Sequence, residues 1–137
     1  MPLDFEALSD WDFEEIRQSL TERDTILYAL GLGFGEDPTD KKELAFVYED
    51  GLKAVPSMAV TMGYPGFWLR DPRTGVNWQQ VLHGEQWLDI YKPLPVNGNI
   101  IGRSKIDFIS DKGEGKGAVI YQSREIIDAD SGEKLAR

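Results

Sequence analysis

The sequence predicts an α+β fold in which helical segments come first and a run of antiparallel strands follows. Two observations carry this prediction. Apolar residues between Asp24 and Leu30 have helical spacing, and the glycine-rich run 31–35 comes directly after them. From Asn99 onward, segments rich in β-branched residues alternate with turn sequences, which is typical of strands joined as hairpins.

Two helices are predicted, both in the first half of the chain. The first begins in the stretch Ser19–Arg23 and ends at the glycines of 31–35, because a helix C-terminus favours glycine in the left-handed conformation. The second begins at Pro56 and is broken within about two turns by Gly63–Gly66, since proline removes a donor and clashes with the preceding turn. This second helix is therefore expected to be short.

Other N-terminal segments carry weaker patterns. Residues 1–12 are acidic and aromatic, and the whole stretch 1–19 is expected to be a loose lead-in to the domain. Leu44–Tyr48 is apolar and aromatic and is predicted to be a strand. The glycines of 31–35 resemble a phosphate-binding loop, but the helix precedes them instead of following them, so this interpretation is rejected.

The stretch Val81–Tyr91 contains the only histidine and is predicted to be a strand. From Glu85 its residues alternate between two faces, as in a half-buried β-strand, and two prolines shortly after it end it. His83 is either a core-edge histidine bonded to the backbone or a site residue, because an imidazole titrates near physiological pH. Gly84 would let another backbone or a ligand approach closely.

Three strands are predicted after the turn sequence Asn97-Gly98. They span Asn99–Phe108, Ala118–Ile127 and Glu133–Arg137. The mixed phase of the first strand predicts a bulge near Gly102–Arg103. The last strand stops with the sequence and is expected to be truncated, which would leave an open sheet edge that pairs in a dimer or a complex.

The composition limits the classes of partner. The chain has 137 residues, which suits one domain with its own core, and it has no run of about 18 apolar residues that could span a membrane. Its formal net charge is −9, which argues against nucleic acid or an anionic membrane surface, because both require a basic surface. It contains no cysteine, which excludes disulfides and thiolate metal sites and suits a reducing compartment such as the cytoplasm.

Five runs of the sequence share a further pattern: Asp24–Gly33, Pro56–Val60, Val81–Gln86, Tyr91–Pro95 and Asp111–Gly115. Together they resemble the N-terminal half of the MaoC-like dehydratases. That family includes the (R)-specific 2-enoyl-CoA hydratases, also called hydratase 2, of bacteria and of the peroxisomal multifunctional enzyme type 2. The resemblance implies a single hot-dog domain over residues 1–137, in which an antiparallel sheet surrounds a short, broken central helix.

The resemblance further implies a function with acyl-CoA thioesters. Adding water across a 2-enoyl-CoA requires a general base, a general acid and donors for the enolate oxygen. In the family these come from a motif with Asp, Asn-Pro and His in the C-terminal half, and this chain contains no such motif. No catalytic residue is therefore assigned. The chain is expected to accommodate the acyl-CoA, with the thioester as substrate and with no separate cofactor or metal.

The missing motif predicts a partner. The resemblance implies a second hot-dog half that carries the motif, either further along a longer chain or as a separate subunit. Association of identical chains through the sheet is the alternative. The expected location is the cytoplasm, or the peroxisome if the organism is a eukaryote.

Eight residues are candidates for contact with the substrate. The resemblance implies that His83 and Gly84 line the path of the acyl-CoA. Lys112, in the loop 111–117, is expected to meet a phosphate or the adenine end of coenzyme A; the alternative is a solvated hairpin turn. The candidates for an acyl pocket, for which core packing is the alternative, are Met58, Met62, Tyr64, Phe67 and Trp68.

Two other functions stay open. The chain is a non-catalytic acyl-CoA-binding hot-dog subunit, or it is an independent thioesterase-like hot-dog enzyme that uses Glu85 or an aspartate. His83 and Glu85 lie two residues apart on the predicted strand and share a face. The carboxylate could therefore orient the imidazole and replace the missing motif.

Overall fold

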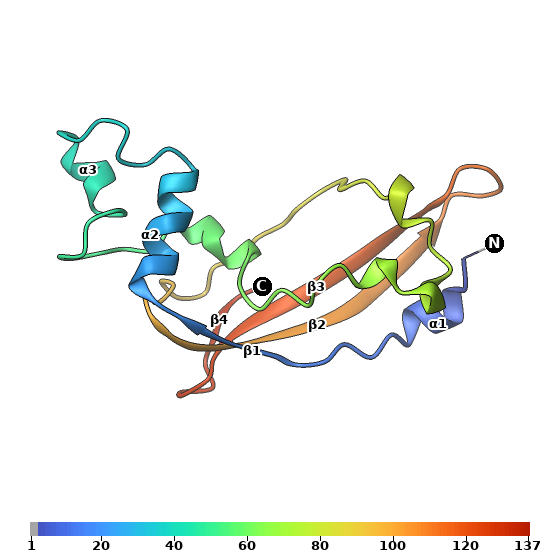
Figure 1. Cartoon of the computed structure of the whole chain (residues 1–137). Helices are drawn as coiled ribbons and strands as arrows, with labels where there is room; N and C mark the ends of the chain where they lie inside the picture. Colours follow the sequence, from blue (N-terminus) through green and yellow to red (C-terminus); the bar gives the residue numbers. More distant parts are fainter. Residues whose placement is uncertain (1–2) are drawn as a thin grey trace.

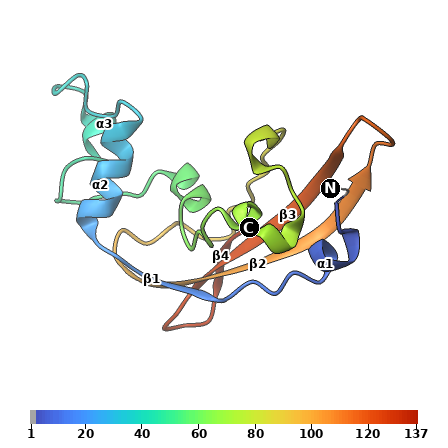
Figure 2. The same cartoon turned by 45° about the vertical axis from the view of Figure 1, so that its right-hand side comes forward.

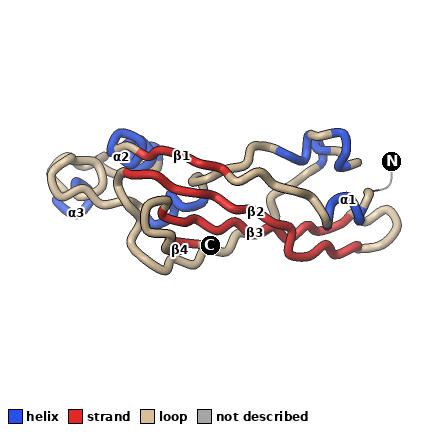
Figure 3. The backbone as a smooth tube through the Cα atoms, turned by 90° about the horizontal axis from the view of Figure 1, so that it is seen from below, coloured by secondary structure: helices blue, strands red, loops and turns tan. Residues whose placement is uncertain are grey.

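Four antiparallel strands form one sheet, and their order in space is their order in the chain. The structure, a computed structural model, describes residues 3–137. The strands are β1 (Ile16–Leu20), β2 (Gly98–Asp111), β3 (Ala118–Asp128) and β4 (Lys134–Ala136). Figure 1 shows the long hairpin of β2 and β3, and Figure 3 shows that β1 lies beside only the first part of β2.

The hairpin of β2 and β3 confirms the prediction for this part of the chain. The pairing runs from Ile100 opposite Asp128 to Asp111 opposite Ala118, and β-branched residues occur throughout both strands. Its register shifts between Ile106 and Phe108, so the bulge predicted near Gly102–Arg103 is wrong. Gly102 stays in register with Ile126 of β3. Because it has no side chain, the backbone of Gly63 can pack against it.

Helix α2 (Glu22–Gly31) forms as predicted, because its first turn has a complete capping box. The Thr21 hydroxyl accepts from the Asp24 N–H at 3.3 Å, and the Asp24 carboxylate accepts from the Thr21 N–H at 2.8 Å. Thr25 is fully buried, and its hydroxyl donates to the Val96 carbonyl at 2.8 Å. This last bond attaches the helix to the segment that leads into β2.

The loose lead-in predicted for residues 1–19 is wrong over the part that the structure describes, and residues 1–2 lie outside it. Helix α1 (Phe5–Ser9) begins at Asp4, whose carboxylate accepts from a backbone N–H of the first turn, and Leu8 on this helix is fully buried. Strand β1 then pairs with β2 from Ile16 to Leu20. Long-range burial and pairing order this segment, and neither is visible in its local composition.

A helical turn replaces the strand predicted for Leu44–Tyr48. Helix α3 (Lys41–Leu44) begins at Asp40, whose side chain caps its first turn, and hydrogen-bonded turns continue through residue 48. The sheet contains no strand from this region, so an extended segment here would have no ladder to join.

Four short 3₁₀ helices occupy the segment between α3 and β2. They are η1 (Pro56–Val60), η2 (Trp68–Arg70), η3 (Pro72–Thr74) and η4 (Trp78–Gln80). Helix η1 confirms the predicted Pro56 helix and its early end. Figures 1 and 2 show η1 beside α2 at one end of the sheet, with the later turns over the other end. Among residues 3–137, no helix has the length and apolarity needed to cross a membrane.

The core lies between η1 and the sheet. Its buried members come from β1, η1 and the turn after it, the segment before β2 and the three later strands. They are Leu20, Met58, Ala59, Met62, Leu94, Ile100, Ile126, Leu135 and Ala136. A short central helix packed against an antiparallel sheet is the arrangement expected from the sequence. The α+β class is therefore confirmed.

Just after η1, the backbone of Gly63 packs closely against Gly102 of β2. A Cβ atom added to Gly102 would lie 2.6 Å from the Cα of Gly63, and the reverse addition gives the same distance. Gly63 also has a φ of 58°, which L side chains rarely adopt. Its N–H donates to the Gln18 side chain of β1 at 2.8 Å, so the crossing is held in place.

The regular strand predicted for Val81–Tyr91 is wrong except at its end. Asp89 exchanges two backbone hydrogen bonds with Arg137, of 2.8 and 2.9 Å, and Ile90 forms a bridge with Ala136. Over the described part of the chain, no backbone hydrogen bond joins residues 82–88 to another segment. Strand β4 is three residues long, so these upstream residues have no strand beside them.

Gly102→Ala is expected to lower the free energy of unfolding by about 1–3 kcal/mol, because the new methyl group overlaps the Gly63 backbone. Gly84→Ala is the matched control: Gly84 is exposed, and a Cβ added there has no atom within 4 Å. Urea denaturation followed by tryptophan fluorescence measures both variants. Equal unfolding midpoints for Gly102→Ala and Gly84→Ala would show that the contact between Gly63 and residue 102 adjusts to the methyl group without a loss of stability.

Candidate functional site

A cleft of about 690 Å³ opens between residues 46–56 and residues 90–96. This volume lies within the range of small-molecule sites, roughly 300–1,000 Å³. Nine of its eleven lining residues are apolar or aromatic and two are lysines. They are Phe46, Leu52, Lys53, Ala54, Pro56, Ile90, Tyr91, Lys92, Pro93, Leu94 and Val96.

Backbone hydrogen bonds hold the two walls of this cleft. The Lys53 N–H donates to the Ala45 carbonyl at 2.8 Å, which attaches one wall to the turn after α3. The Tyr91 N–H donates to the Leu135 carbonyl at 2.9 Å, which attaches the other wall to β4. Leu94 is 8% exposed and belongs to the core, so the cleft is continuous with the packed interior. The walls are therefore formed before any ligand binds.

Both charged groups of the cleft are cations. Lys53 and Lys92 are exposed, and Lys92 forms an ion pair with Glu133. That pair is about half exposed on both sides, so it contributes little stability. Two ammonium groups beside an apolar surface suit a ligand with an anionic end and an apolar tail, even though the formal net charge of the chain is −9.

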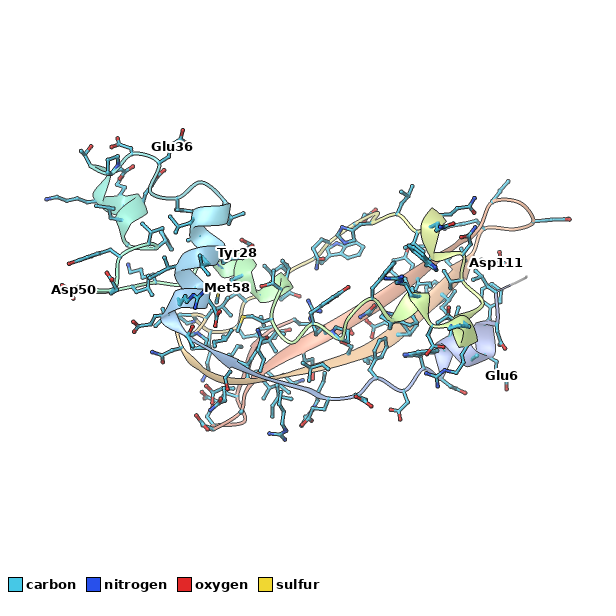
Figure 4. All side chains as sticks on the ribbon, in the orientation of Figure 1. Glu6, Tyr28, Glu36, Asp50, Met58 and Asp111 are labelled. Carbon is cyan, nitrogen blue, oxygen red and sulfur yellow. The ribbon has the colours of Figure 1, made fainter. Side chains whose placement is uncertain are left out.

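The five predicted acyl-pocket residues do not line this cleft. Met58 and Met62 are 2% and 1% exposed and belong to the core, so the alternative of core packing is the observed one for them. Figure 4 shows Met58 close to Tyr28 of α2, whose hydroxyl is 2.9 Å from Ser57 of η1. Helix η1 is therefore packed against the sheet and against α2.

The three predicted aromatic residues lie on other surfaces. Tyr64 is 56% exposed and lies under the guanidinium of Arg124, 5.7 Å from it. Burial lowers the pKa of Arg124 from its usual value, and the nearby Tyr64 opposes this. Trp68 packs against Trp11 at a ring distance of 5.2 Å, near α1. Phe67 is 43% exposed, so none of the three forms an enclosed pocket with the methionines.

His83, Gly84 and Glu85 lie on the exposed segment upstream of Asp89. The strand that would have held His83 and Glu85 on one face is not formed there. The structure therefore does not bring a carboxylate and the imidazole together by strand geometry. Their contact with substrate stays a prediction.

Lys112 lies at the tip of the β2–β3 hairpin, away from the cleft. Its N–H donates to the Gly117 carbonyl at 3.0 Å, which closes the loop, and its side chain is exposed. Figure 4 shows Asp111 and Asp50 at opposite ends of the molecule. Strand β2 has fourteen residues, so Lys112 and the cleft are separated by roughly 40 Å along the strand at about 3.3 Å per residue.

Sequence reasoning missed most of the cleft residues. Phe46 lies in the segment predicted to be a strand, and Leu52–Ala54 has no local pattern that indicates the wall of a cleft. The one available signal was the run Tyr91–Pro95, which is part of the resemblance and forms the other wall. Within residues 3–137, no group of three or more His, Cys, Asp or Glu side chains could hold a metal ion.

Residues 18–137 match the family described as MFE-2 hydratase 2 N-terminal domain. Enoyl-CoA hydratase 2, peroxisomal, of Arabidopsis thaliana is 34% identical over 128 residues, which is 88% of this chain and 41% of that protein. The chain thus spans about two fifths of the length of this curated relative.

Two solved structures share the fold. The full-length peroxisomal multifunctional enzyme type 2 of Drosophila melanogaster has a TM-score of 0.67 and 31% identity, over 90% of this chain and 21% of its own. A MaoC-like dehydratase from Phytophthora capsici has a TM-score of 0.72 and 25% identity, over 98% of this chain and 46% of its own. The resemblance stated from the sequence and the hot-dog fold are confirmed. The chain belongs to the family of hydratase 2 N-terminal domains found in multifunctional enzyme type 2.

Proposed function

We propose that this chain is the half of an (R)-specific 2-enoyl-CoA hydratase, or of a 3-hydroxyacyl-CoA dehydratase, that accommodates the acyl-CoA. The observation that carries the proposal is the apolar cleft with Lys53 and Lys92 in a member of the hydratase 2 family. An acyl-CoA has a long apolar tail and a polyanionic end, which are the two features that such a cleft can bind. In a eukaryotic cell the proposed location is the peroxisome, the compartment in the name of the plant relative.

The cleft supports tail binding on energetic grounds. Removing each methylene group from water contributes about 0.8 kcal/mol. Several methylene groups against Ile90, Tyr91 and Leu52 would therefore offset the cost of ordering a flexible chain. Because the walls are attached to β4 and to α3, little protein ordering is added to that cost.

Catalysis is proposed to reside in a second hot-dog half. The chain has no Asp/Asn-Pro/His motif, and the strand that would pair His83 with Glu85 is not formed. A fixed acid and base are needed for hydration, and exposed side chains on an unpaired segment do not supply them. The relatives that contain this domain are longer proteins, which supports a completing half as the partner.

The purified chain is expected not to hydrate a 2-enoyl-CoA at a rate on the order of 10 per second, the usual scale for enzymes. The loss of the enoyl thioester absorbance measures hydration for the chain alone and for the chain mixed with a polypeptide that carries the motif. Activity is expected only in the mixture. Hydration by the chain alone would return the chemistry to His83 and Glu85, and thioester hydrolysis would indicate a thioesterase-like enzyme.

Ile90→Glu is expected to weaken binding of a long-chain acyl-CoA at least tenfold, because it places a carboxylate on the apolar wall and burying that charge is costly. A tenfold loss corresponds to about 1.4 kcal/mol. Leu27→Glu is the matched control, because Leu27 is an exposed residue of α2 outside the cleft. This variant should bind the acyl-CoA with unchanged affinity. Calorimetric titration measures both variants. Equal affinities would place the acyl tail elsewhere.

Lys112 is proposed to contribute more to coenzyme A binding than Lys116. Lys112 directly follows the last residue of β2 and its N–H is bonded to the Gly117 carbonyl, whereas Lys116 lies within the glycine-rich turn, where more ordering entropy must be lost. One charge-assisted contact to a phosphate is worth about 1.5–3 kcal/mol, roughly tenfold or more in the dissociation constant. Titration of Lys112→Ala and Lys116→Ala with an acyl-CoA, in the presence of the completing half, compares them. Equal small losses for both variants, or a loss only for Lys116→Ala, would show that this loop acts as a diffuse charge or only as a turn.

A further inference from the structure

The two lysines of the cleft differ in their ionic contacts. Lys92 forms an ion pair with Glu133, which lies in the turn between β3 and β4. Within residues 3–137, no carboxylate forms an ion pair with Lys53, although Lys53 is exposed like Lys92. The cleft therefore has one cation with a counter-ion and one without.

Backbone hydrogen bonds bring Lys92 and Glu133 together. The Lys92 N–H donates to the Leu135 carbonyl at 3.3 Å, and Leu135 follows Glu133 by two residues. The Glu133 carbonyl accepts from the Asp128 N–H at 2.9 Å, and the Glu133 N–H donates to the Ser131 hydroxyl at 3.2 Å. Because both backbones are fixed, only side-chain torsions lose freedom when the ion pair forms.

The turn that carries Glu133 is closed by further hydrogen bonds. The Asp128 carboxylate accepts from the N–H groups of Asp130 and Ser131, at 2.9 and 2.8 Å. The Gly132 N–H donates to the Asp128 carbonyl at 2.9 Å, and Gly132 has a φ of 75°, which glycine adopts readily. The turn therefore fixes the position of the Glu133 backbone next to Lys92.

The ion pair makes the two lysines unequal as contacts for an anion. The ammonium group of Lys53 has three donors, and no carboxylate of the described chain pairs with it. Lys92 would have to leave Glu133 before it could bind an anion with its full charge. The Glu133 carboxylate also repels an anion at this place, because the distance is shorter than the screening length of about 8–10 Å.

We infer that Glu133 is a specificity-determining residue of the cleft: it holds Lys92 and leaves Lys53 as the contact for the anionic end of a ligand. The inference rests on the proposed function only for the identity of that ligand, a long-chain acyl-CoA. An ion pair that is about half exposed contributes little stability, so a phosphate can displace Glu133, but part of its binding free energy is lost in doing so. The apolar tail then decides which ligands bind, because the anionic end alone gains little.

Titration with octyl phosphate, followed by NMR, tests this inference without coenzyme A. The probe has an alkyl tail and one phosphate group. Glu133→Gln is expected to bind it about threefold or more tightly than the unaltered chain, because Lys92 is released and a repelling carboxylate is removed. Glu125→Gln is the matched control: it removes the same charge and breaks the ion pair with Lys134, and neither residue lines the cleft. Its affinity should stay unchanged.

The same titration identifies the lysine that meets the phosphate. In the unaltered chain, the resonance of the side-chain carbon next to the ammonium group should shift for Lys53 and much less for Lys92. In Glu133→Gln, both resonances should shift. Lys53→Ala should bind octyl phosphate about threefold or more weakly, because the unpaired cation is removed.

Three outcomes overturn the inference. Equal affinities of Glu133→Gln and Glu125→Gln would show that only the net charge of the chain matters. Equal shifts of Lys53 and Lys92 in the unaltered chain would show that Glu133 does not hold Lys92 back. Octyl phosphate that binds neither the unaltered chain nor Glu133→Gln would remove the anion contact. If the expected results are obtained but a long-chain acyl-CoA does not bind in calorimetric titration, the inference stands and only the proposed ligand fails.

Discussion

The backbone contact between Gly63 and Gly102 is the constraint on which the rest of this domain depends. Helix η1 ends at Val60, and at Gly63 the chain crosses β2 at a distance that no side chain would permit. Neighbouring strands hold the same point: Gln18 of β1 accepts from Gly63, and Arg124 of β3 donates to the Val60 carbonyl. Polar contacts from two strands and a steric contact with a third thus fix where the central helix stops.

Residues of η1 contribute both to the core and to the cleft. Toward the sheet, Met58 and Met62 fill the core, and each is almost fully buried. Pro56, at the start of the helix, lines the cleft together with residues of two other segments. The side chains of the short helix therefore contribute mainly to the core, and most of the cleft is lined by irregular segments attached to β4 and to the turn after α3.

The charge of the cleft differs from that of the whole chain. The chain as a whole is acidic, yet the two charged side chains of the cleft are lysines, and two more lysines, Lys112 and Lys116, lie on the hairpin loop. Exposed lysines act on an anionic ligand at short range, because salt screens charges beyond about 8–10 Å. The polyanionic thioester proposed as ligand would thus meet a local cationic surface, although the net charge of the chain would repel it at a distance.

The sequence by itself determined the elements that local chemistry specifies. The capping box at Thr21 starts α2, Pro56 starts η1, and β-branched residues with a glycine-rich turn form the hairpin of β2 and β3. The α+β class followed from those elements, and the family resemblance followed from five short runs of sequence. Each of these features depends on residues within one turn or one hairpin.

Only the tertiary structure decided which segments become strands and where the cleft lies. Ile16–Leu20 pairs with β2 although it has no strand signal, whereas Leu44–Tyr48 has that signal but no neighbouring ladder. The cleft joins residues about forty positions apart, and local patterns do not report such a meeting. A strand is stable only with a partner, and a pocket exists only between packed segments, so both are properties of long-range contacts.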